Sequence, residues 1–382
     1  MTDGALEGLH VLDISTLFAA PQIAAVLGDL GADVVKIEPP QGDPLRAMGA
    51  QRDGRSLMWA LAARNKRSMT LDLDNEVERE VLHRLVERAD VLVENFSHAT
   101  LERWHCTYDE LAARNSRLVM VSVSCYGATG PYRDRPGAGT LAEAFGGLTN
   151  MIGEADGPPM LPSVALGDTV TAMAGVIGTL AACYHRDAGG GRGQHVDVSM
   201  YEPILQLLAG TIAAYDPRGE PTRRTGSRVP GGVPRNVYRT GDGRWVVVSG
   251  TTDAQVARLL PLIGRDTPED RARFGRSAAR LAAADELDGL VADWIAAHDL
   301  DDVIDAFLGA RIPAAAVNDL PAILDDPHVS ARASLVQVED DELGPLMMPA
   351  PTPHLSGTPG RIRATGPKLG AHNDEVMREW LA

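Results

Sequence analysis

The 382-residue chain has little positive charge, few cysteines and few aromatic side chains. Its net charge of −16 argues against non-specific binding to nucleic acid or to an anionic membrane surface. The three cysteines, Cys106, Cys125 and Cys183, form no CxxC pair and give no disulfide framework. The sequence does not open on a basic stretch followed by an apolar run, so no secretory signal is expected. These features favour a cytoplasmic protein in a reducing compartment.

Sequence motifs of membrane, cofactor and metal sites are also missing. The longest uncharged run, Thr169–His185, is short for a membrane span and is interrupted by threonines and glycines. The turn after the first predicted strand, residues 15–21, has no glycine, which disfavours NAD or FAD bound in the usual mode. No GxxxxGK[ST], HExxH or GxSxG motif and no paired Cys/His spacing occurs. We therefore expect no membrane partner, no metal and no permanently bound cofactor.

The N-terminal half alternates segments typical of strands and helices. Apolar runs predict strands at 9–15, 33–38, 68–73, 90–96, 118–124 and 195–200. Helices are predicted at 20–32, 75–89, 108–115, from Asp168 to about His185, and at 202–215. The predicted buried face of the 75–89 helix comprises Val77, Val81, Leu82, Leu85 and Val86. This alternation predicts an α/β fold with a parallel sheet covered on both faces.

The C-terminal half has a different pattern. Residues 216–235 are rich in Pro, Gly and Arg and predict a linker. A hairpin is predicted at 236–250, turning at 241–243, with helices at 253–263, 287–298 and 301–309 and strands at 314–317 and 334–340. We expect a large domain at 1–215, a linker at 216–235, a small α+β domain at 236–330, and a C-terminal segment at 331–382 that returns to the large domain.

Asp168 has surroundings that invite a functional interpretation. It lies in the segment SVALGDTVTAMAG, residues 163–175, and no charged residue follows it before Arg186. One interpretation is structural, because Asp is common at a helix N-cap, where its carboxylate accepts from first-turn amides. The other is catalytic, because a poorly hydrated carboxylate held ionised by helix N-terminal amides can attack an activated acyl group. The residues alone leave both interpretations open.

Two other kinds of segment carry candidate binding residues. RNKR, residues 64–67, and Arg103 supply cations that either contact an anionic ligand or remain solvated at the surface. Asn95 and Phe96 end a predicted strand, and ligands of open parallel sheets bind beyond the carboxyl ends of the strands. Phe96 either stacks on a planar ring or packs in the core.

Eight motifs occur in one order: LEGLHVLDIS, GADVVKIEPPQGDPLR, NKRSMTLDLD, VENF, CYGATGPYRDRPG, ALGD, GRGQHVDVSM and LGAHNDEVM. With this combination the chain resembles the family III CoA-transferases of CaiB/BaiF type, which include formyl-CoA transferase, carnitine CoA-transferases and α-methylacyl-CoA racemases. The resemblance covers nearly the whole chain and is weaker across residues 220–330. It implies a Rossmann-like large domain that binds CoA and an interlocked homodimer, with the active site near the large domain of one chain and the small domain of the other.

The resemblance also implies a mechanism in which Asp168 is the catalytic residue. Asp168 would attack the thioester of a donor acyl-CoA, and the resulting anhydride would be converted by the CoA thiolate into an aspartyl-CoA thioester. A small carboxylic acid acceptor would take the CoA by the reverse steps, in a site that restricts water. CoA is then a substrate rather than a resident cofactor. The implied CoA contacts are Leu71, Asp72, Leu73 and Asp74 beside the adenine, Asn95, Phe96 and Ala138, Arg103 at a phosphate, and Met200 near the carboxylate.

The chain departs from formyl-CoA transferase at several matching positions. Phe18 stands in place of a glutamine, Pro39 in place of an arginine, and Ala138-Gly139 in place of a tyrosine–glutamate pair. Formyl or oxalyl specificity is therefore not expected. Instead, we expect a larger acyl group in the space left by Ala138 and Gly139.

Two other functions remain as alternatives. A racemase or epimerase of 2-methylacyl-CoA needs a histidine and the aspartate on opposite faces of an α-carbon. No histidine lies between His105 and His185, and the matching residue is Ala138, which favours the transferase, although Glu143 is an alternative base. A CoA-binding protein without catalytic activity is the other alternative.

Overall fold

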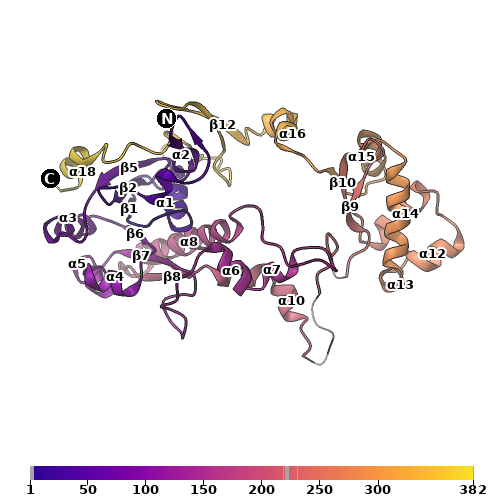
Figure 1. The fold of residues 1–382 in the computed structure, drawn as a ribbon, viewed down its shortest axis with the longest axis horizontal. Helices are drawn as coiled ribbons and strands as arrows, with labels where there is room; N and C mark the ends of the chain where they lie inside the picture. The colour runs from indigo at the N-terminus through magenta and orange to yellow at the C-terminus, as the bar shows by residue number, and fades with distance from the viewer. Residues whose placement is uncertain (1–3, 218, 220–222, 230, 382) are drawn as a thin grey trace. The chain divides into compact units, whose positions relative to one another are not determined.

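Six strands form one parallel sheet in the part of the chain nearest the N-terminus (Figure 1). The structure is a computed structural model that describes residues 4–217, 219, 223–229 and 231–381. The strands are β1 (His10–Asp13), β2 (Asp33–Glu38), β5 (Lys66–Thr70), β6 (Val91–Glu94), β7 (Val119–Ser124) and β8 (His195–Ser199). They confirm the predicted parallel sheet, with β5 beginning two residues earlier than predicted.

The order of the strands creates a crevice at the centre of the sheet. The order is β5-β2-β1-β6-β7-β8, as in a Rossmann fold, so the chain builds outward from β1 in one direction and then from β6 in the other. β1 pairs with both β2 and β6, with Leu12 opposite Val35 on one side and Leu92 on the other. The loops that leave the carboxyl ends of β1 and β6 therefore diverge, and ligands of such sheets bind at this point.

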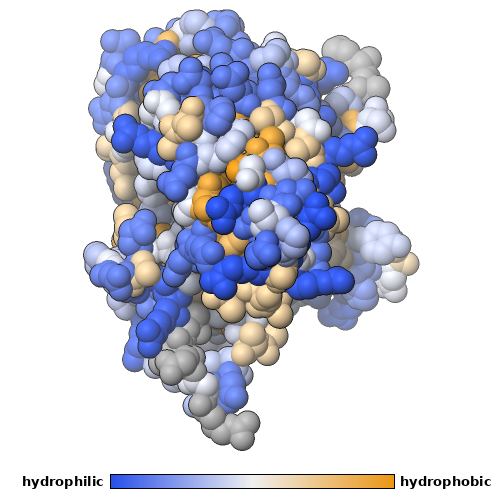
Figure 2. Space-filling model, turned by 90° about the vertical axis from the view of Figure 1, so that its right-hand side faces the viewer, coloured by the Kyte–Doolittle hydropathy of each residue, from blue (hydrophilic) through white to orange (hydrophobic). Residues whose placement is uncertain are grey.

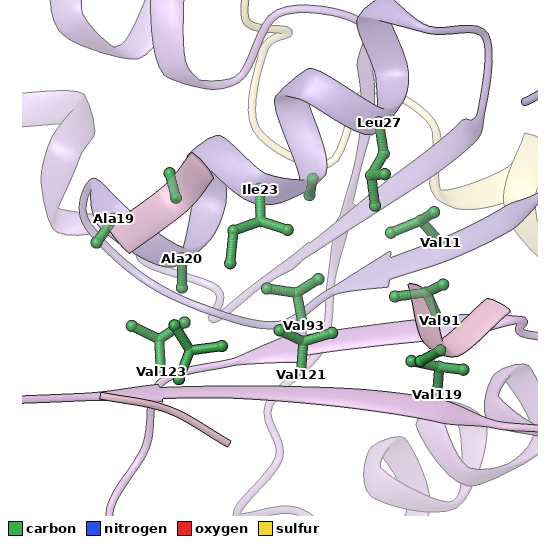
Figure 3. Close-up of a cluster of buried hydrophobic side chains, with 14 of the residues drawn as sticks. Val11, Ala19, Ala20, Ile23, Leu27, Val91, Val93, Val119, Val121 and Val123 are labelled. Carbon is green, nitrogen blue, oxygen red and sulfur yellow. The ribbon is translucent and has the colours of Figure 1, made fainter. Parts of the chain in front are cut away.

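One face of the sheet packs against two helices, α1 (Ala19–Asp29) and α8 (Leu166–His185). Figure 3 shows the apolar side chains of α1 pointing toward those of β1, β6 and β7: Ala19, Ala20, Ile23 and Leu27 face Val11, Val91, Val93, Val119, Val121 and Val123. The close approach of α8 depends on small residues, and a Cβ at Gly175 would lie 2.3 Å from Ile23 Cδ1. The small-residue sequence of α8 therefore explains how it packs.

The opposite face of the sheet carries the intervening residues of the same strands, such as Leu12, Leu92 and Met120. They pack against α3 (Glu76–Val86), α5 (Tyr108–Arg114) and the C-terminal α18 (Asn373–Leu381). Because both faces are covered, the central strands β1, β6 and β7 are mainly apolar, as predicted, whereas β5 and β8 also carry charged residues. The predicted buried face of α3 is wrong at Val77, which is 77% exposed because it lies in the first turn, before the residues that reach the core.

The other elements that lie in the same part of the chain as the parallel sheet are short. They are η1 (Pro44–Ala47), β3 (Gln51–Arg52), β4 (Arg55–Ser56), α2 (Leu57–Ala62), α4 (His98–Arg103), α6 (Gly139–Phe145), α7 (Leu148–Met151), η2 (Arg186–Gly190), α9 (Tyr201–Leu207), α10 (Ala209–Ala213), β12 (Leu335–Asp340) and β13 (Gly344–Pro349). The helix predicted at 202–215 is two helices, because it is interrupted at Leu208.

The chain divides into two compact units. The first comprises residues 1–149, 161–220 and 331–382, and the second comprises 150–160 and 221–330. The second has a three-stranded sheet, β9 (Arg235–Arg239), β10 (Trp245–Ser249) and β11 (Ala314–Ala316), and the helices α11 (Asp253–Leu262), α12 (Pro268–Phe274), α13 (Ser277–Ala282), α14 (Ala284–Ala296), α15 (Leu300–Gly309), α16 (Leu320–Asp325) and α17 (Pro327–Ala331). The predicted hairpin is confirmed, whereas α12 and α13 were not predicted. Residues 218, 220–222 and 230 of the predicted linker lie outside the described residues.

The surface has the polarity expected of an acidic chain. The side of the molecule seen in Figure 2 is mostly hydrophilic, with apolar side chains gathered in a limited area. Within the described residues, one helical segment, Leu166–Gly190, is long and apolar enough to cross a membrane by length and composition alone. The helix is longer than the predicted uncharged run, because α8 begins before residue 169 and continues into η2. One such helix is weak evidence for a membrane span, and α8 packs on α1 with one side, so that 39% of its 18-residue apolar stretch is buried.

Candidate active site

A cavity of about 1020 Å³ opens in the first unit at the carboxyl ends of the sheet strands. Its walls come from the residues that follow β1, β6 and β7, from β8, and from the starts of α6 and α8. This is the position expected from the strand order. A volume of this size accommodates a cofactor-sized ligand.

Asn95 joins the loops that follow β1 and β6 at the centre of the sheet. Its side-chain amide donates to the Thr16 carbonyl at 2.9 Å, and its Oδ1 accepts from the Thr16 N–H at 2.8 Å. Both polar atoms of Asn95 are therefore engaged with the backbone of the first βα turn. Asn95 lines the cavity and holds the shape of one wall, while its contact with CoA stays a prediction.

Asp168 lies on the cavity wall in the first turn of α8 and is half-buried. It is the third residue of the helix, and the N-cap is Ala165, whose side chain makes no capping hydrogen bond. The Gly167 N–H instead donates to Oε1 of Glu143, on α6, at 2.7 Å. The structural interpretation of Asp168 as the N-cap is therefore wrong, because another acid takes the free amide of the first turn.

Glu143 is almost completely buried beside the catalytic candidate. Glu143 is 1% exposed, and its Oε2 has no hydrogen-bond partner among the described residues. Burial raises the pKa of Asp168 above its ordinary value, the charge of Glu143 raises it further, and the backbone amide of Asp168 lowers it. The result is an accessible carboxylate that is more basic than an ordinary aspartate, as a nucleophile requires.

Gly139 contacts the Asp168 carboxylate directly. A Cβ at position 139 would lie 2.4 Å from Asp168 Oδ2 and 2.8 Å from its Cγ, so no side chain fits there without moving Asp168. This corrects the expectation that a larger acyl group occupies the space at Gly139, because the Asp168 side chain already fills it. Ala138 lines the cavity and is exposed.

The predicted CoA contacts fall into two groups. Those that line the cavity are Asn95, Phe96, Ala138 and Met200, together with Asp168, the predicted catalytic residue. The segment Leu71, Asp72, Leu73 and Asp74 lies outside its lining, with Leu71 and Leu73 buried in the core. Arg103 also lies outside the lining, and its Nε is 3.3 Å from Oδ1 of Asp74. Trp104 connects the two groups. Its ring makes a T-shaped contact with the ring of Phe96, with 4.7 Å between the centroids, and its Nε1–H donates to Oδ1 of Asp74 at 2.7 Å.

The cations of residues 64–67 form internal ion pairs rather than a binding site or a solvated loop. The pairs are Arg64–Asp29 at 2.6 Å, Lys66–Asp13 at 2.8 Å and Arg67–Asp33 at 2.6 Å. Lys66 is buried at the start of β5, and burial lowers its pKa to about 8 despite the adjacent carboxylate. Both interpretations offered for this segment are therefore wrong, because the acids that neutralise it are distant in sequence.

The cavity also contains ionisable residues that were not predicted as site residues from the sequence. Glu94 ends β6 and is buried, and its Oε2 accepts from the Phe96 N–H at 2.7 Å. Burial raises the pKa of Glu94 to about 7, although hydrogen bonds from Ser122 and Phe96 lower it. His195 is hydrogen-bonded to Ser122 Oγ at 2.7 Å and is stacked on Tyr108. Glu94 could have been found from its place at the carboxyl end of β6, whereas His195 begins β8 and had no such signal.

Comparisons with known proteins agree with this geometry. The sequence matches the model of CoA-transferase family III over residues 6–373. It is 40% identical to the succinyl-CoA–L-malate CoA-transferase beta subunit of Chloroflexus aurantiacus, over 98% of this chain and 94% of that protein. It is 38% identical, over 98% of this chain and 94% of the relative, to succinyl-CoA–D-citramalate CoA-transferase of the same organism.

A solved structure supports the same conclusion. A CAIB/BAIF family protein from Brucella suis superposes with a TM-score of 0.85 at 29% identity, covering 99% of this chain and 100% of that one. The α/β fold, the match over almost the whole chain and the relatives together establish that this protein belongs to CoA-transferase family III and is a CoA-transferase of that family.

Proposed function

We propose that this enzyme transfers CoA from succinyl-CoA to a 2-hydroxy dicarboxylic acid through a covalent intermediate on Asp168. The substrate class rests on two relatives of 38–40% identity, which act on succinyl-CoA with L-malate or D-citramalate. The mechanism rests on the position of Asp168, an accessible carboxylate in the cavity at the carboxyl ends of the strands. This placement is the single observation that carries the proposal.

The reaction proceeds by exchange between carboxylates, without water. An oxygen of Asp168 attacks the thioester carbon of succinyl-CoA. The C–S bond breaks, CoA departs as the thiolate, and a succinyl–aspartyl anhydride is formed. The thiolate then attacks the aspartyl carbonyl, which releases succinate and leaves an aspartyl-CoA thioester. The carboxylate of the acceptor attacks this thioester and expels the thiolate, and the thiolate attacks the acceptor's carbonyl in the new anhydride. The acyl-CoA product departs, and Asp168 regains its carboxylate.

The surroundings of Asp168 support its role as the nucleophile. Burial and the charge of Glu143 keep Asp168 basic, while its own backbone amide, in the first turn of α8, favours the ionised form. Hydrolysis would waste either covalent intermediate, so the half-buried position of Asp168 is also favourable.

Two groups on the cavity wall suit the CoA portion of the substrate. Phe96 presents a ring supported edge-on by Trp104, which suits stacking. Arg133 and Arg135 line the same cavity, with the Arg135 guanidinium 3.5 Å from the ring centroid of Tyr132. Arg133 is paired with Asp134 at 3.2 Å, so Arg135 is the better source of local positive charge for an anionic ligand in a chain of net charge −16.

Isotope transfer tests the covalent mechanism. With acceptor labelled by ¹⁸O in the reacting carboxylate, the anhydride's bridging oxygen comes from the acceptor and stays on Asp168 when thiolate attacks. After a single turnover, mass spectrometry should find one ¹⁸O on the peptide that contains Asp168. Incubation with succinyl-CoA alone should also give a CoA adduct on this peptide, absent from Asp168→Asn. Exchange at the wild-type rate in Asp168→Asn would refute the proposal.

The same assays separate the two alternatives. A racemase would exchange the α-proton of a 2-methylacyl-CoA for deuterium in D₂O without any acceptor. A protein that only binds CoA would show neither the adduct nor the exchange. In either case, the racemase or the CoA-binding protein, Asp168 would acquire no ¹⁸O.

We also propose that the enzyme is a homodimer, as the family resemblance implies. Supporting this, Met173, Ile177 and Tyr184 lie on one side of α8 and are 60%, 69% and 76% exposed. An apolar stripe of this kind on a core helix is typical of a surface covered by a partner. A monomer in light scattering after size exclusion would contradict this assignment.

A further inference from the structure

The first turn of α8 is held by an acid that belongs to another helix. Oε1 of Glu143 accepts from the Gly167 N–H at 2.7 Å, and Gly167 directly precedes Asp168. The packing is close, because a Cβ at Gly167 would lie 3.1 Å from both Cγ and Oε1 of Glu143. Any movement of Glu143 therefore reaches the backbone that carries Asp168.

The hydrogen bond to Gly167 explains the position of Oε1 of Glu143, but it does not explain the second oxygen, Oε2. Oε2 is buried and has no hydrogen-bond partner among the described residues, although a buried carboxylate oxygen without a partner is costly. A glutamine would fill the same volume and could offer the same acceptor to Gly167 without the buried charge. The helix tie alone therefore does not account for an acid at this position.

We propose that Glu143 is a positioning residue for Asp168, which fixes the first turn of α8 through Oε1 and places a second negative charge beside the nucleophile. The inference rests on the covalent function proposed above. The two like charges repel each other in a site with little water. When Asp168 becomes an anhydride or a thioester its charge is lost and the repulsion is relieved, so Glu143 favours acylation.

Other ionisable groups surround this part of the cavity. The loop before α6 contributes Arg133, Asp134 and Arg135, the end of β7 contributes Cys125, and β8 contributes His195 and Asp197. Helix α9 packs against α6 and α8 and carries Glu202, which lies outside the cavity lining and accepts from the Ser199 hydroxyl. Among the described residues, Glu143 is the one whose charge raises the pKa of Asp168. Burial is the larger cause of the raised pKa of Asp168, and Glu143 adds to it, so the pH dependence of Asp168 should respond to the charge of Glu143.

Glu143→Gln separates the charge from the helix tie. The variant keeps an acceptor for Gly167 and loses the charge, so the pKa of Asp168 should fall and the acid limb of the kcat/KM profile should move to lower pH. On the plateau, the rate of CoA-adduct formation on Asp168 should fall, because a less basic carboxylate is a weaker nucleophile. The thermal midpoint should stay near that of wild type. Glu7→Gln, an exposed acid, is the control for net charge.

Glu143→Asp provides the complementary variant. It keeps the charge but is too short for the Gly167 contact, so its acid limb should stay near that of wild type while kcat falls. If Glu143→Gln does not fold, this variant decides the matter, and a shifted limb in Glu143→Asp contradicts the inference. Coincident pH profiles for wild type and Glu143→Gln, with adduct in both, overturn only this inference. Absence of adduct in wild type overturns the proposed function as well.

Discussion

At position 139 the missing side chain makes room for the Asp168 carboxylate. Gly139→Ala would place a Cβ 2.4 Å from Asp168 Oδ2, so Asp168 must rotate away from its present direction. Because a misplacement of about 1 Å can cost roughly 100-fold in rate, kcat/KM should fall by about 10- to 100-fold. Stability should change little, since alanine is a better helix former than glycine at the start of α6. Steady-state kinetics and thermal unfolding measure the two effects.

Gly289 provides the matched control for this substitution. It lies inside α14 of the second unit, and no atom lies within 4 Å of the position that a Cβ would take. Gly289→Ala should leave kcat/KM unchanged and raise the free energy of unfolding slightly. Equal activity in wild type and Gly139→Ala would show that Asp168 has another productive position.

At the scale of elements, the loops after β1 and β6 are joined by Asn95. Asn95→Ala removes both hydrogen bonds to Thr16 and leaves its backbone N–H and carbonyl without these partners. We expect a loss of about 1–3 kcal/mol in the free energy of unfolding. We also expect a several-fold rise in KM for the acyl-CoA, because the Thr16–Phe18 wall of the cavity loosens.

Asn75→Ala distinguishes the loop connection from a general loss of stability. Asn75 is the N-cap of α3, where its Oδ1 accepts from the Val77 N–H, and the cap lies outside the cavity lining. Removing it should cost about 1 kcal/mol of stability with no change in KM. If the two variants raise KM equally, Asn95 has no special role in shaping the cavity.

The elements themselves were largely predictable from the sequence. Strands buried on both faces are continuous apolar runs, so β1, β2, β6 and β7 were recognisable. The charged start of β5 was not, because Lys66 is acceptable in a buried strand only beside Asp13, 53 residues earlier. A break such as that at Leu208 depends on packing and leaves no local signal.

The candidate site was predictable only in part. The resemblance named Asp168, and strand ends located Asn95 and Phe96. The contacts that shape the site join residues far apart in sequence, such as Glu143 with Gly167 and Asn95 with Thr16. Periodicity describes one element at a time, so it cannot reveal which acid holds which helix end.

At the scale of the whole molecule, the free energy of unfolding should depend on the charge of Glu94. Burial raises its pKa from 4.5 to about 7, so the folded state holds a proton that the unfolded chain has released. The stabilisation from this proton is complete below pH 4.5 and is lost as pH rises through about 7. The shift corresponds to about 3 kcal/mol.

Glu94→Gln tests this linkage, because glutamine keeps the acceptor for the Phe96 N–H and cannot ionise. The stability of the variant relative to wild type should therefore rise by up to about 3 kcal/mol between about pH 5 and about pH 8. Urea unfolding followed by circular dichroism at the two pH values measures the difference, with the exposed Glu7→Gln as control. A difference that stays constant with pH would mean that Glu94 is already ionised in the folded protein at pH 5. The sheet would then carry a buried negative charge behind Phe96 throughout the range in which the enzyme is assayed.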